Sequence, residues 1–253
     1  MDAPKLLALQ DINERFNGSA RILEVGFGDG SFVKRLARLG YQVVGAETSE
    51  WMVKKAQNDV PEASVFQTDD PSAFPERFDA VCCFEVLEHV ENPIELARKF
   101  PGTLLYASVP NPNRWYPSLT GRFEYWDRPP NHLWRFCSCP PVDTEFHDSE
   151  CIIGEKATLA PLQRATSLKW ILSQSGYTQI TVRATSVQGQ DLLRIIPIRR
   201  NSGDYDEMRQ TGNMRLISST ARRLLTPMTY PIAGVFNLLG YNGVSYYVNA
   251  VRE

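Results

Sequence analysis

The sequence lacks the features of a membrane-spanning or secreted protein. No stretch of its 253 residues approaches the roughly 18 consecutive apolar residues of a transmembrane helix. The N-terminus has no cationic region followed by an apolar run, which a secretory signal peptide requires. We therefore expect no transmembrane segment and no signal peptide, so any contact with a membrane would be peripheral.

The sequence also has few cysteines and little net charge. The five cysteines form an odd number, and Cys82 and Cys83 lie in a predicted buried strand, so we expect no disulfide framework. Free thiols fit a reducing, cytoplasmic location best. The net charge of −2 and the absence of a basic domain argue against a nucleic-acid partner.

The overall composition is that of an ordinary globular protein. Apolar residues make up 43% of the chain and charged residues 22%. A chain of this length is sufficient for one large α/β domain with insertions or for two small domains. We expect residues 1–253 to form that single domain.

The most informative stretch is a glycine-rich turn between a strand and a helix. Residues 22–25 form a short apolar run that reads as a buried strand, and apolar residues at helical spacing follow over 32–39. Between them, Gly26, Gly28 and Gly30 allow the backbone to turn sharply and to lie against a ligand. Strand, glycine turn and helix form the nucleotide-binding corner of a doubly wound sheet.

Two carboxylates beside this turn favour a cationic ligand. Glu24 precedes the loop, and Glu47 ends the next apolar run, where it could accept hydrogen bonds from ribose hydroxyls. The third glycine comes one residue earlier than in the dinucleotide pattern G-x-G-x-x-G. A second carboxylate suits S-adenosylmethionine (SAM), which carries an ammonium and a sulfonium but no phosphate. At this point the sequence resembles the class I SAM-dependent methyltransferase family.

The resemblance implies a set of SAM-binding residues. Asp69, with Asp70 as its rival, matches the acidic position that contacts adenine, and Phe84 and Glu85 end the strand that lines the methionine part of SAM. The implied cofactor site consists of Glu24, Gly26, Gly28, Gly30, Glu47, Thr48, Asp69, Phe84 and Glu85. Outside residues 20–110 the resemblance weakens.

The order of elements agrees with that family's fold. Strands near 65–67, 78–84 and 103–109 alternate with helices, which predicts a parallel, doubly wound sheet. The resemblance implies a Rossmann-like, seven-stranded sheet, mostly parallel with one antiparallel edge strand. Strand six would span 179–184 and strand seven 245–251. Two insertions depart from the pattern, over 137–166 and 190–243, and Pro227 should limit a helix in the second.

Candidate catalytic groups follow the fourth strand and a later aromatic loop. Methyl transfer to a hydroxyl requires removal of its proton, and a histidine suits that task near neutral pH. We expect His132 and His89 to be catalytic, with Glu85 as a further candidate base. An arginine of the loop, among Arg114, Arg122, Arg128 and Arg135, could hold an anionic group of the substrate.

A structural zinc site is a separate hypothesis. Cys137, Cys139, His147 and Cys151 have a recognised zinc-ligand composition, but the C-x-C spacing is tight. Free thiols are the plainer alternative, so the predicted site residues include no metal ligand.

The sequence therefore predicts a SAM-dependent methyltransferase that acts on a small molecule or glycan, with transfer to oxygen favoured. A lipid or quinone methyltransferase and a non-catalytic SAM-binding regulator remain alternatives. The acceptor, the acceptor atom and the oligomeric state are left open.

Overall fold

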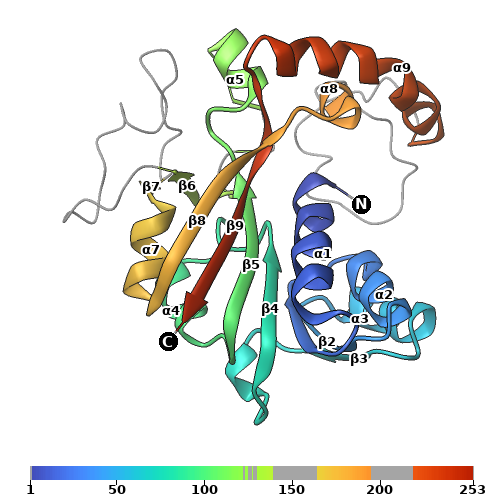
Figure 1. Cartoon of the computed structure of the whole chain (residues 1–253), viewed down its shortest axis with the longest axis vertical. Coiled ribbons are helices and arrows are strands. Elements are labelled where there is room, and N and C mark those ends of the chain that lie inside the picture. The colour runs from blue at the N-terminus through green and yellow to red at the C-terminus, as the bar shows by residue number, and fades with distance from the viewer. Residues whose placement is uncertain are drawn as a thin grey trace.

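The structure is a computed structural model that describes residues 2–121, 123–124, 127, 130–138, 164–194 and 219–252. Its centre is a seven-stranded sheet in the order β3-β2-β1-β4-β5-β9-β8 (Figure 1). The strands are β1 (Arg21–Val25), β2 (Gln42–Glu47), β3 (Ser64–Gln67), β4 (Phe78–Phe84), β5 (Gly102–Pro110), β8 (Tyr177–Ser186) and β9 (Asn242–Arg252).

Six of the seven strands run in one direction. The pairs among β1 to β5 are parallel, while β9 runs antiparallel to both β5 and β8. Strand β8 therefore forms the edge of the sheet, and the antiparallel strand β9 lies between β5 and β8. This topology confirms the predicted Rossmann-like fold. Both strands of the antiparallel pair extend beyond the predicted ranges by one or more residues at each end.

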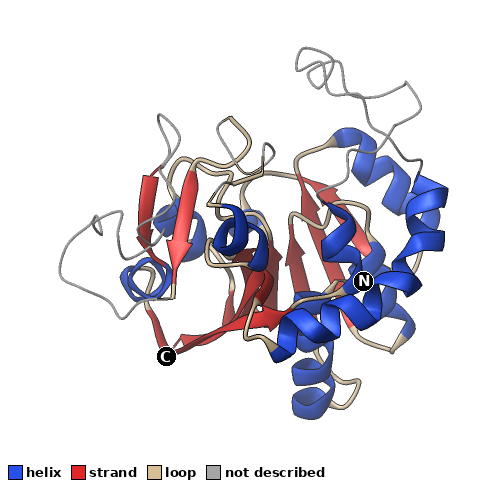
Figure 2. Ribbon diagram, turned by 90° about the horizontal axis from the view of Figure 1, so that it is seen from above, coloured by secondary structure: helices blue, strands red, loops and turns tan. Residues whose placement is uncertain are grey.

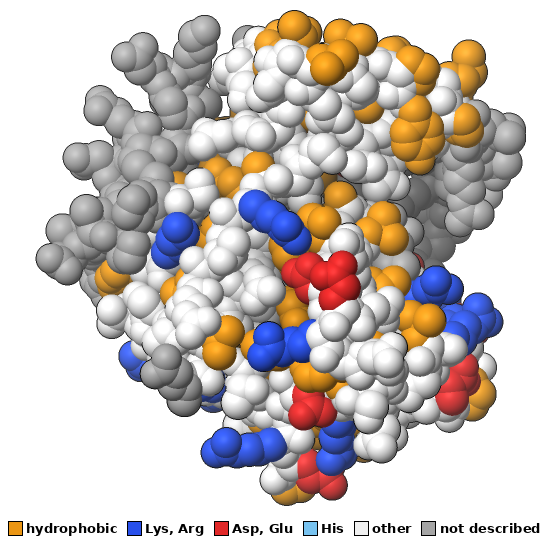
Figure 3. Space-filling model, viewed as in Figure 1, with side chains coloured by type: hydrophobic (Ala, Val, Ile, Leu, Met, Phe, Trp, Pro, Cys, Tyr) orange, Lys and Arg blue, Asp and Glu red, His pale blue; other side chains and the backbone are white. Residues whose placement is uncertain are grey.

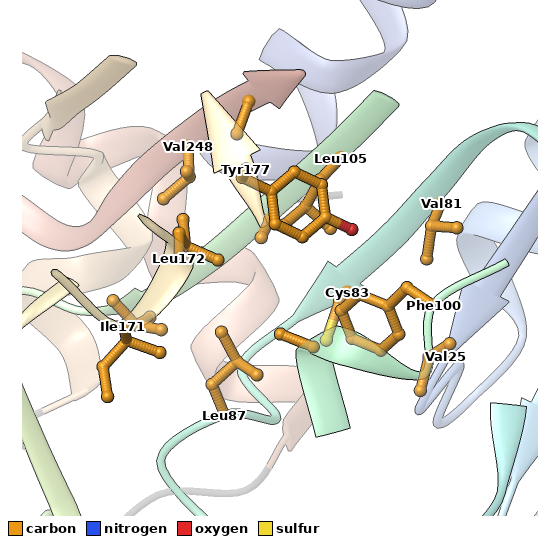
Figure 4. Close-up of a cluster of buried hydrophobic side chains, with 14 of the residues drawn as sticks. Val25, Val81, Cys83, Leu87, Phe100, Leu105, Ile171, Leu172, Tyr177 and Val248 are labelled. Carbon is orange, nitrogen blue, oxygen red and sulfur yellow. The ribbon is translucent and has the colours of Figure 1, made fainter. Parts of the chain in front are cut away.

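Helices cover both faces of the sheet, as Figure 2 shows from above. One face packs against α1 (Ala3–Phe16), α2 (Ser31–Arg38) and α3 (Glu50–Asp59), and the other against α4 (Pro93–Arg98) and α7 (Leu168–Gln174). On the second face Leu105 and Val248 of the sheet pack with Leu172 of α7 (Figure 4). Burial on both faces explains why the strands read as continuous apolar runs.

Local capping fixes where several helices begin. The side chain of Ser49 accepts a hydrogen bond from Met52 N, and Asn92 accepts one from Glu95 N at 3.1 Å. Serine and asparagine are preferred at this position because their side chains satisfy otherwise unpaired N–H groups of the first turn. Phe27, Phe32 and Leu36 then anchor the glycine turn and α2 in the core.

Additional elements gather near the carboxyl ends of the parallel strands. These elements are α5 (Trp115–Thr120), α8 (Gly189–Arg194), α9 (Ser219–Leu238) and a small parallel sheet of β6 (Trp134–Cys137) and β7 (Arg164–Ser167). A short 3-10 helix, η1, spans Pro71–Ala73. In Figure 1 α5, α8 and α9 lie together at the top, beyond the upper ends of β5 and β8.

One prediction about α9 was wrong. We expected Pro227 to limit the helix, but α9 continues through both Pro227 and Pro231 to Leu238. A proline removes an intrahelical hydrogen bond at a cost of about 3 kcal/mol, which packing elsewhere in the helix can outweigh. Asn237 provides part of that packing, because its side chain bonds both the N–H and the C=O of Val187.

The predicted insertions fall partly outside the described residues. Residues 139–163 of the first and 195–218 of the second are not described. The limits 137–166 and 190–243, and the single domain over 1–253, therefore stay predictions.

Candidate active site

The glycine turn places three left-handed residues at the carboxyl end of β1. Gly26, Gly28 and Gly30 have φ values of 69°, 56° and 71°, a region that other residues adopt only with strain. A Cβ on Gly26 would lie 2.5 Å from the Val86 side chain. A Cβ on Gly28 would meet nothing within 4 Å, so Gly28 borders open space where a ligand could approach its backbone.

Glu47 connects the end of β2 to this turn. Its carboxylate accepts hydrogen bonds from Gly28 N at 2.9 Å, from Thr48 N at 2.8 Å and from Ser49 N at 3.1 Å. These donors hold a half-buried carboxylate at the strand end beside the glycine loop. A fixed acceptor in this position suits the hydroxyls of a ribose.

Glu24 is a fully buried carboxylate beside the same turn. Lys5 of α1 places its ammonium 3.4 Å from Glu24 Oε1, and the two side chains are 15% and 0% exposed. Among the described residues, neither carboxylate oxygen of Glu24 accepts a hydrogen bond. Burial raises the pKa of Glu24 to about 7, although Lys5 opposes the shift. The site thus contains an under-satisfied anion that favours a cationic partner.

Aromatic rings surround the Lys5 ammonium. Its Nζ lies 6.0 Å from the centre of the Phe32 ring and 5.6 Å from that of Phe84. These two rings pack edge to face, with centroids 5.1 Å apart. Carboxylate and ring faces together form an environment that stabilises positive charge.

The two candidate adenine contacts differ in their surroundings. Asp70 caps η1, because its carboxylate accepts bonds from Ser72 N at 3.0 Å and from Ser72 Oγ at 2.7 Å. Asp69 is exposed at the end of β3. The structural role of Asp70 leaves Asp69 as the better candidate for a ligand contact.

Glu85 follows β4 in a strained backbone conformation. Its φ of 54° is unusual for a residue with a side chain, and its carboxylate accepts a hydrogen bond from Ser108 Oγ at 2.8 Å. Such outliers persist where the surrounding structure enforces them, often at ligand sites. Phe84 before it is buried, and Glu85 is half-buried.

His132 belongs to a buried network of charges. Its Nδ1 lies 2.8 Å from Asp127 Oδ1, and Arg135 donates to Asp127 Oδ2 at 2.9 Å. Arg114 bonds both Asp127 and Glu124. The arginines and His132 hold the pKa of Asp127 well below its usual range, against the effect of burial. The contact with Asp127 fixes the orientation of the His132 ring, with Nδ1 towards the carboxylate.

His89 lies against His132 although the two are 43 positions apart in the chain. The ring centroids are 4.7 Å apart and the ring planes make an angle of 79°. Nδ1 of His89 contacts the carbonyl of Asn131. Leu133 N donates to Glu88 O at 2.8 Å, which joins the two loops that carry the histidines. Burial and the neighbouring His132 lower the pKa of His89, so its ring is neutral at neutral pH.

Sequence reasoning missed three residues of this region. Glu88 and Asp127 are buried and Lys5 is partly buried, and all three lie beside predicted site residues. Glu88 directly precedes His89 and Asp127 lies five positions before His132, so a search for carboxylates close to each histidine would have found both. No local signal indicates Lys5, because only the packing of α1 brings it to Glu24.

The expectation that a loop arginine holds the substrate is wrong for Arg114 and Arg135. Both are buried, and their guanidinium groups bond the carboxylates of Glu124 and Asp127. Arg135 also stacks 3.4 Å from the centre of the Phe123 ring. Arg122 and Arg128 lie outside the described residues.

The zinc hypothesis is not tested by the structure. Cys137 is buried, and Cys139, His147 and Cys151 lie outside the described residues.

Curated relatives are enzymes of quinone synthesis. The chain is 30% identical over 131 residues to a ubiquinone biosynthesis O-methyltransferase of Proteus mirabilis, which covers 46% of this chain and 54% of that protein. It is 38% identical over 104 residues to the protein of the same name from Xanthomonas campestris, and this match covers 36% of this chain and 44% of that protein. The chain thus matches about half the length of these relatives.

Solved structures and a family profile extend the likeness. A SAM-dependent methyltransferase from Archaeoglobus fulgidus matches 99% of this chain and 95% of its own, with a TM-score of 0.53 and 18% identity. The match to a methyltransferase of the same kind from Mesorhizobium loti covers 99% of this chain and 98% of that protein, with a TM-score of 0.53 and 17% identity. At these identities the likeness concerns the fold. The profile of the family described as "Methyltransferase domain" matches residues 3–182, well over half of the sequence. The chain therefore belongs to the methyltransferase domain family, which confirms its resemblance to the class I SAM-dependent methyltransferases.

Proposed function

We propose that the protein transfers the methyl group of SAM to a hydroxyl oxygen of a small molecule. The observation that carries the proposal is the contact between His132 and His89, which follows the carboxyl end of β4. Ligands of open α/β sheets bind at that edge. The family supports the reaction class, and the histidine pair supports an acceptor whose proton must be removed.

In this proposal each part of SAM has its own contacts. Glu24 attracts the α-ammonium, Glu47 and Thr48 bind the ribose, and Asp69 bonds the adenine amino group. The turn through Gly26, Gly28 and Gly30 allows close approach, and Phe84 and Glu85 line the methionine part. The open space beside Gly28 and the under-satisfied charge of Glu24 support this arrangement.

The reaction is an in-line displacement. The acceptor oxygen forms a bond to the methyl carbon while the carbon–sulfur bond breaks, and its electron pair stays on sulfur as the neutral thioether of S-adenosylhomocysteine. The leaving group is already good, so the protein contributes alignment and activation of the hydroxyl. His132, oriented by Asp127, and His89 provide that activation in this proposal.

Labelled SAM provides the direct test. The purified chain is incubated with methyl-labelled SAM and separate panels of phenols, alcohols and glycans, and products are identified by mass spectrometry. We expect one panel to yield a methyl ether. Tight SAM binding with no labelled product from any panel would instead favour a SAM-binding regulator.

A second candidate acceptor is an apolar intermediate of quinone synthesis. Its specific support is the group of large apolar side chains exposed on α9 and directly after it: Met228, Tyr230, Ile232, Val235, Leu238 and Leu239. Figure 3 shows hydrophobic side chains gathered along the top of the molecule, where Figure 1 places α9. The names of the curated relatives point to the same acceptor class.

This candidate predicts peripheral contact with lipid. Among the described residues, no helix has the length and apolarity needed to cross a bilayer. We expect the protein to sediment with phosphatidylglycerol-containing vesicles, and Leu238→Asp with Leu239→Asp to abolish sedimentation because charges on this face resist burial in lipid. Leu119→Asp, at an exposed site on α5, is the matched control. Equal sedimentation of all three proteins would reject lipid binding through α9.

The proposed setting is a reducing cytoplasm. Cys82 and Cys83 are buried free thiols, and burial raises the pKa of both well above the usual value. Buried thiols of this kind are inert rather than redox-active.

A further inference from the structure

Glu88 is the least satisfied charged group beside the histidine pair. Its side chain is 0% exposed, and among the described residues neither carboxylate oxygen has a hydrogen-bond partner. Such a group is costly unless a proton or a cation neutralises it.

Two arginines of the same region pair with other carboxylates. Arg114 contacts Glu124 and Asp127, and Arg135 contacts Asp127. Within the described part of the chain, the group closest to an ion pair with Glu88 is His89, whose Nε2 lies 3.8 Å from Glu88 Oε1. Nδ1 of His89 faces the carbonyl of Asn131, which leaves Nε2 to face Glu88.

One carboxylate and two imidazoles converge here. Glu88, His89 and His132 each offer a ligand atom, and these atoms all lie within 4.8 Å of one another. We propose that Glu88, His89 and His132 bind a divalent transition-metal ion that holds the oxygen of the methyl acceptor. Three protein ligands leave positions open for a substrate oxygen, as in catalytic zinc sites.

The surroundings supply the second shell that such a site requires. Asp127 accepts the Nδ1 proton of His132, and the carbonyl of Asn131 contacts Nδ1 of His89. With Nδ1 held in this way on both rings, the Nε2 atoms would be the ones to bind the metal, because carboxylates and carbonyls orient metal-binding histidines by the same contacts. The backbone bonds from Leu133 and Trp134 to Glu88 O hold the two loops in register.

The ligand set selects the kind of ion. Two nitrogens and one carboxylate suit Zn²⁺, Co²⁺, Mn²⁺ or Fe²⁺ better than Mg²⁺ or Ca²⁺, which prefer oxygen ligands. Metal–ligand bonds of about 2.0–2.2 Å require the three atoms to draw together by about 1 Å. His89 is exposed and can make that adjustment by rotation.

A cation here would activate the acceptor without a change in redox state. The acceptor hydroxyl binds the ion, which lowers the pKa of the hydroxyl, and its proton passes to solvent. The oxygen then attacks the methyl carbon of SAM as described above. His89 and His132 act as ligands in this step. This inference rests on the proposed function, but the presence of the metal site can be measured without SAM or acceptor.

The test uses the full chain, stripped with a chelator and titrated with Co²⁺ or Zn²⁺ alone. We expect about one equivalent to bind, with visible Co²⁺ absorption and no intense near-ultraviolet sulfur band. Glu88→Gln should weaken binding about tenfold or more, and so should His132→Ala. His147→Ala and Cys139→Ser are controls that should bind like wild type. No uptake by wild type, or equal uptake by Glu88→Gln, would overturn the site.

Two further measurements separate this inference from the proposed function. SAM affinity, measured by calorimetry, should stay within about twofold in Glu88→Gln, which also shows that this variant is folded. Once an acceptor is identified, methyl transfer should be lost on stripping and return with added metal. Full activity of the stripped enzyme would refute the acceptor role, whereas a lack of transfer with and without metal, despite intact metal binding, would count against the proposed function.

Discussion

Glu24 is the residue at which charge, burial and ligand binding are most closely linked. Its pKa of about 7 lies above the ordinary value, so the folded protein keeps a proton on this group that the unfolded chain would release. Its contribution to stability is therefore largest below the ordinary carboxyl pKa and falls as the pH rises towards 7. A bound SAM ammonium would favour the ionised carboxylate of Glu24, so the complex would be favoured as the pH rises.

The first prediction concerns proton release from Glu24. Between pH 6 and 7, SAM binding should release a fraction of a proton, and SAM affinity should rise with pH through this range. Calorimetry in two buffers of different ionisation enthalpy measures the release. Glu24→Gln should bind SAM more weakly and release no proton, and an unchanged release in that variant would contradict the assignment.

Glu47 should contribute to SAM affinity through the ribose. Glu47→Ala removes a carboxylate that three backbone N–H groups already position. We expect a loss of about 1.5–3 kcal/mol in SAM binding, the usual value for hydrogen bonds to a charged group. Asp70→Ala, which removes only the cap of η1, is the comparison variant. SAM affinity equal to wild type in Glu47→Ala would reject the ribose contact.

The histidine pair should affect turnover more than SAM binding. His132→Ala and His89→Ala should each lower kcat about 10²–10⁴-fold, because each variant removes a group that activates the acceptor. SAM affinity should persist in both. Activity within a few-fold of wild type in both variants would leave catalysis to alignment by the pocket.

At the scale of the element, the turn between β1 and α2 needs glycine for two different reasons, the backbone conformation and the lack of space for a side chain. Gly26 and Gly28 both have positive φ, but only a Cβ on Gly26 would collide with Val86. Gly26→Ala should therefore add an overpacking cost of about 1–3 kcal/mol to the backbone strain of about 1–2 kcal/mol. Gly28→Ala should carry the backbone strain alone.

Binding should rank these two variants in the opposite order. Gly28 borders open space, so a methyl group there would obstruct a ligand rather than the protein. We expect Gly28→Ala to lose SAM affinity while it remains the more stable of the two in urea denaturation. If Gly28→Ala binds SAM like wild type, the cofactor does not approach that position.

At the scale of the whole molecule, ligand binding should appear as added stability. A ligand that binds only the folded state at 100 times its Kd contributes about 2.7 kcal/mol. For a chain of this size that corresponds to a rise in Tm of about 5–10 °C. SAM should produce this shift in thermal melts and NADH should not, and an equal shift with NADH would indicate a dinucleotide site.

Local patterns in the sequence determined the fold and the glycine corner. The apolar runs, the glycine spacing and the caps at Ser49 and Asn92 act between residues a few positions apart, so they can be read from the sequence alone. The parallel order of the strands then brings Glu24, Glu47 and Glu85 to one sheet edge.

Only the tertiary structure decided which distant side chains meet. The approach of His89 to His132, of Lys5 to Glu24, and of Asp127 to the buried arginines depends on how loops and α1 pack against the sheet. The continuation of α9 through Pro227 likewise reflects packing rather than local preference. Long-range contacts produce no periodic pattern in the sequence. The burial of the Glu88 carboxylate without a hydrogen-bond partner among the described residues therefore follows only from the tertiary structure.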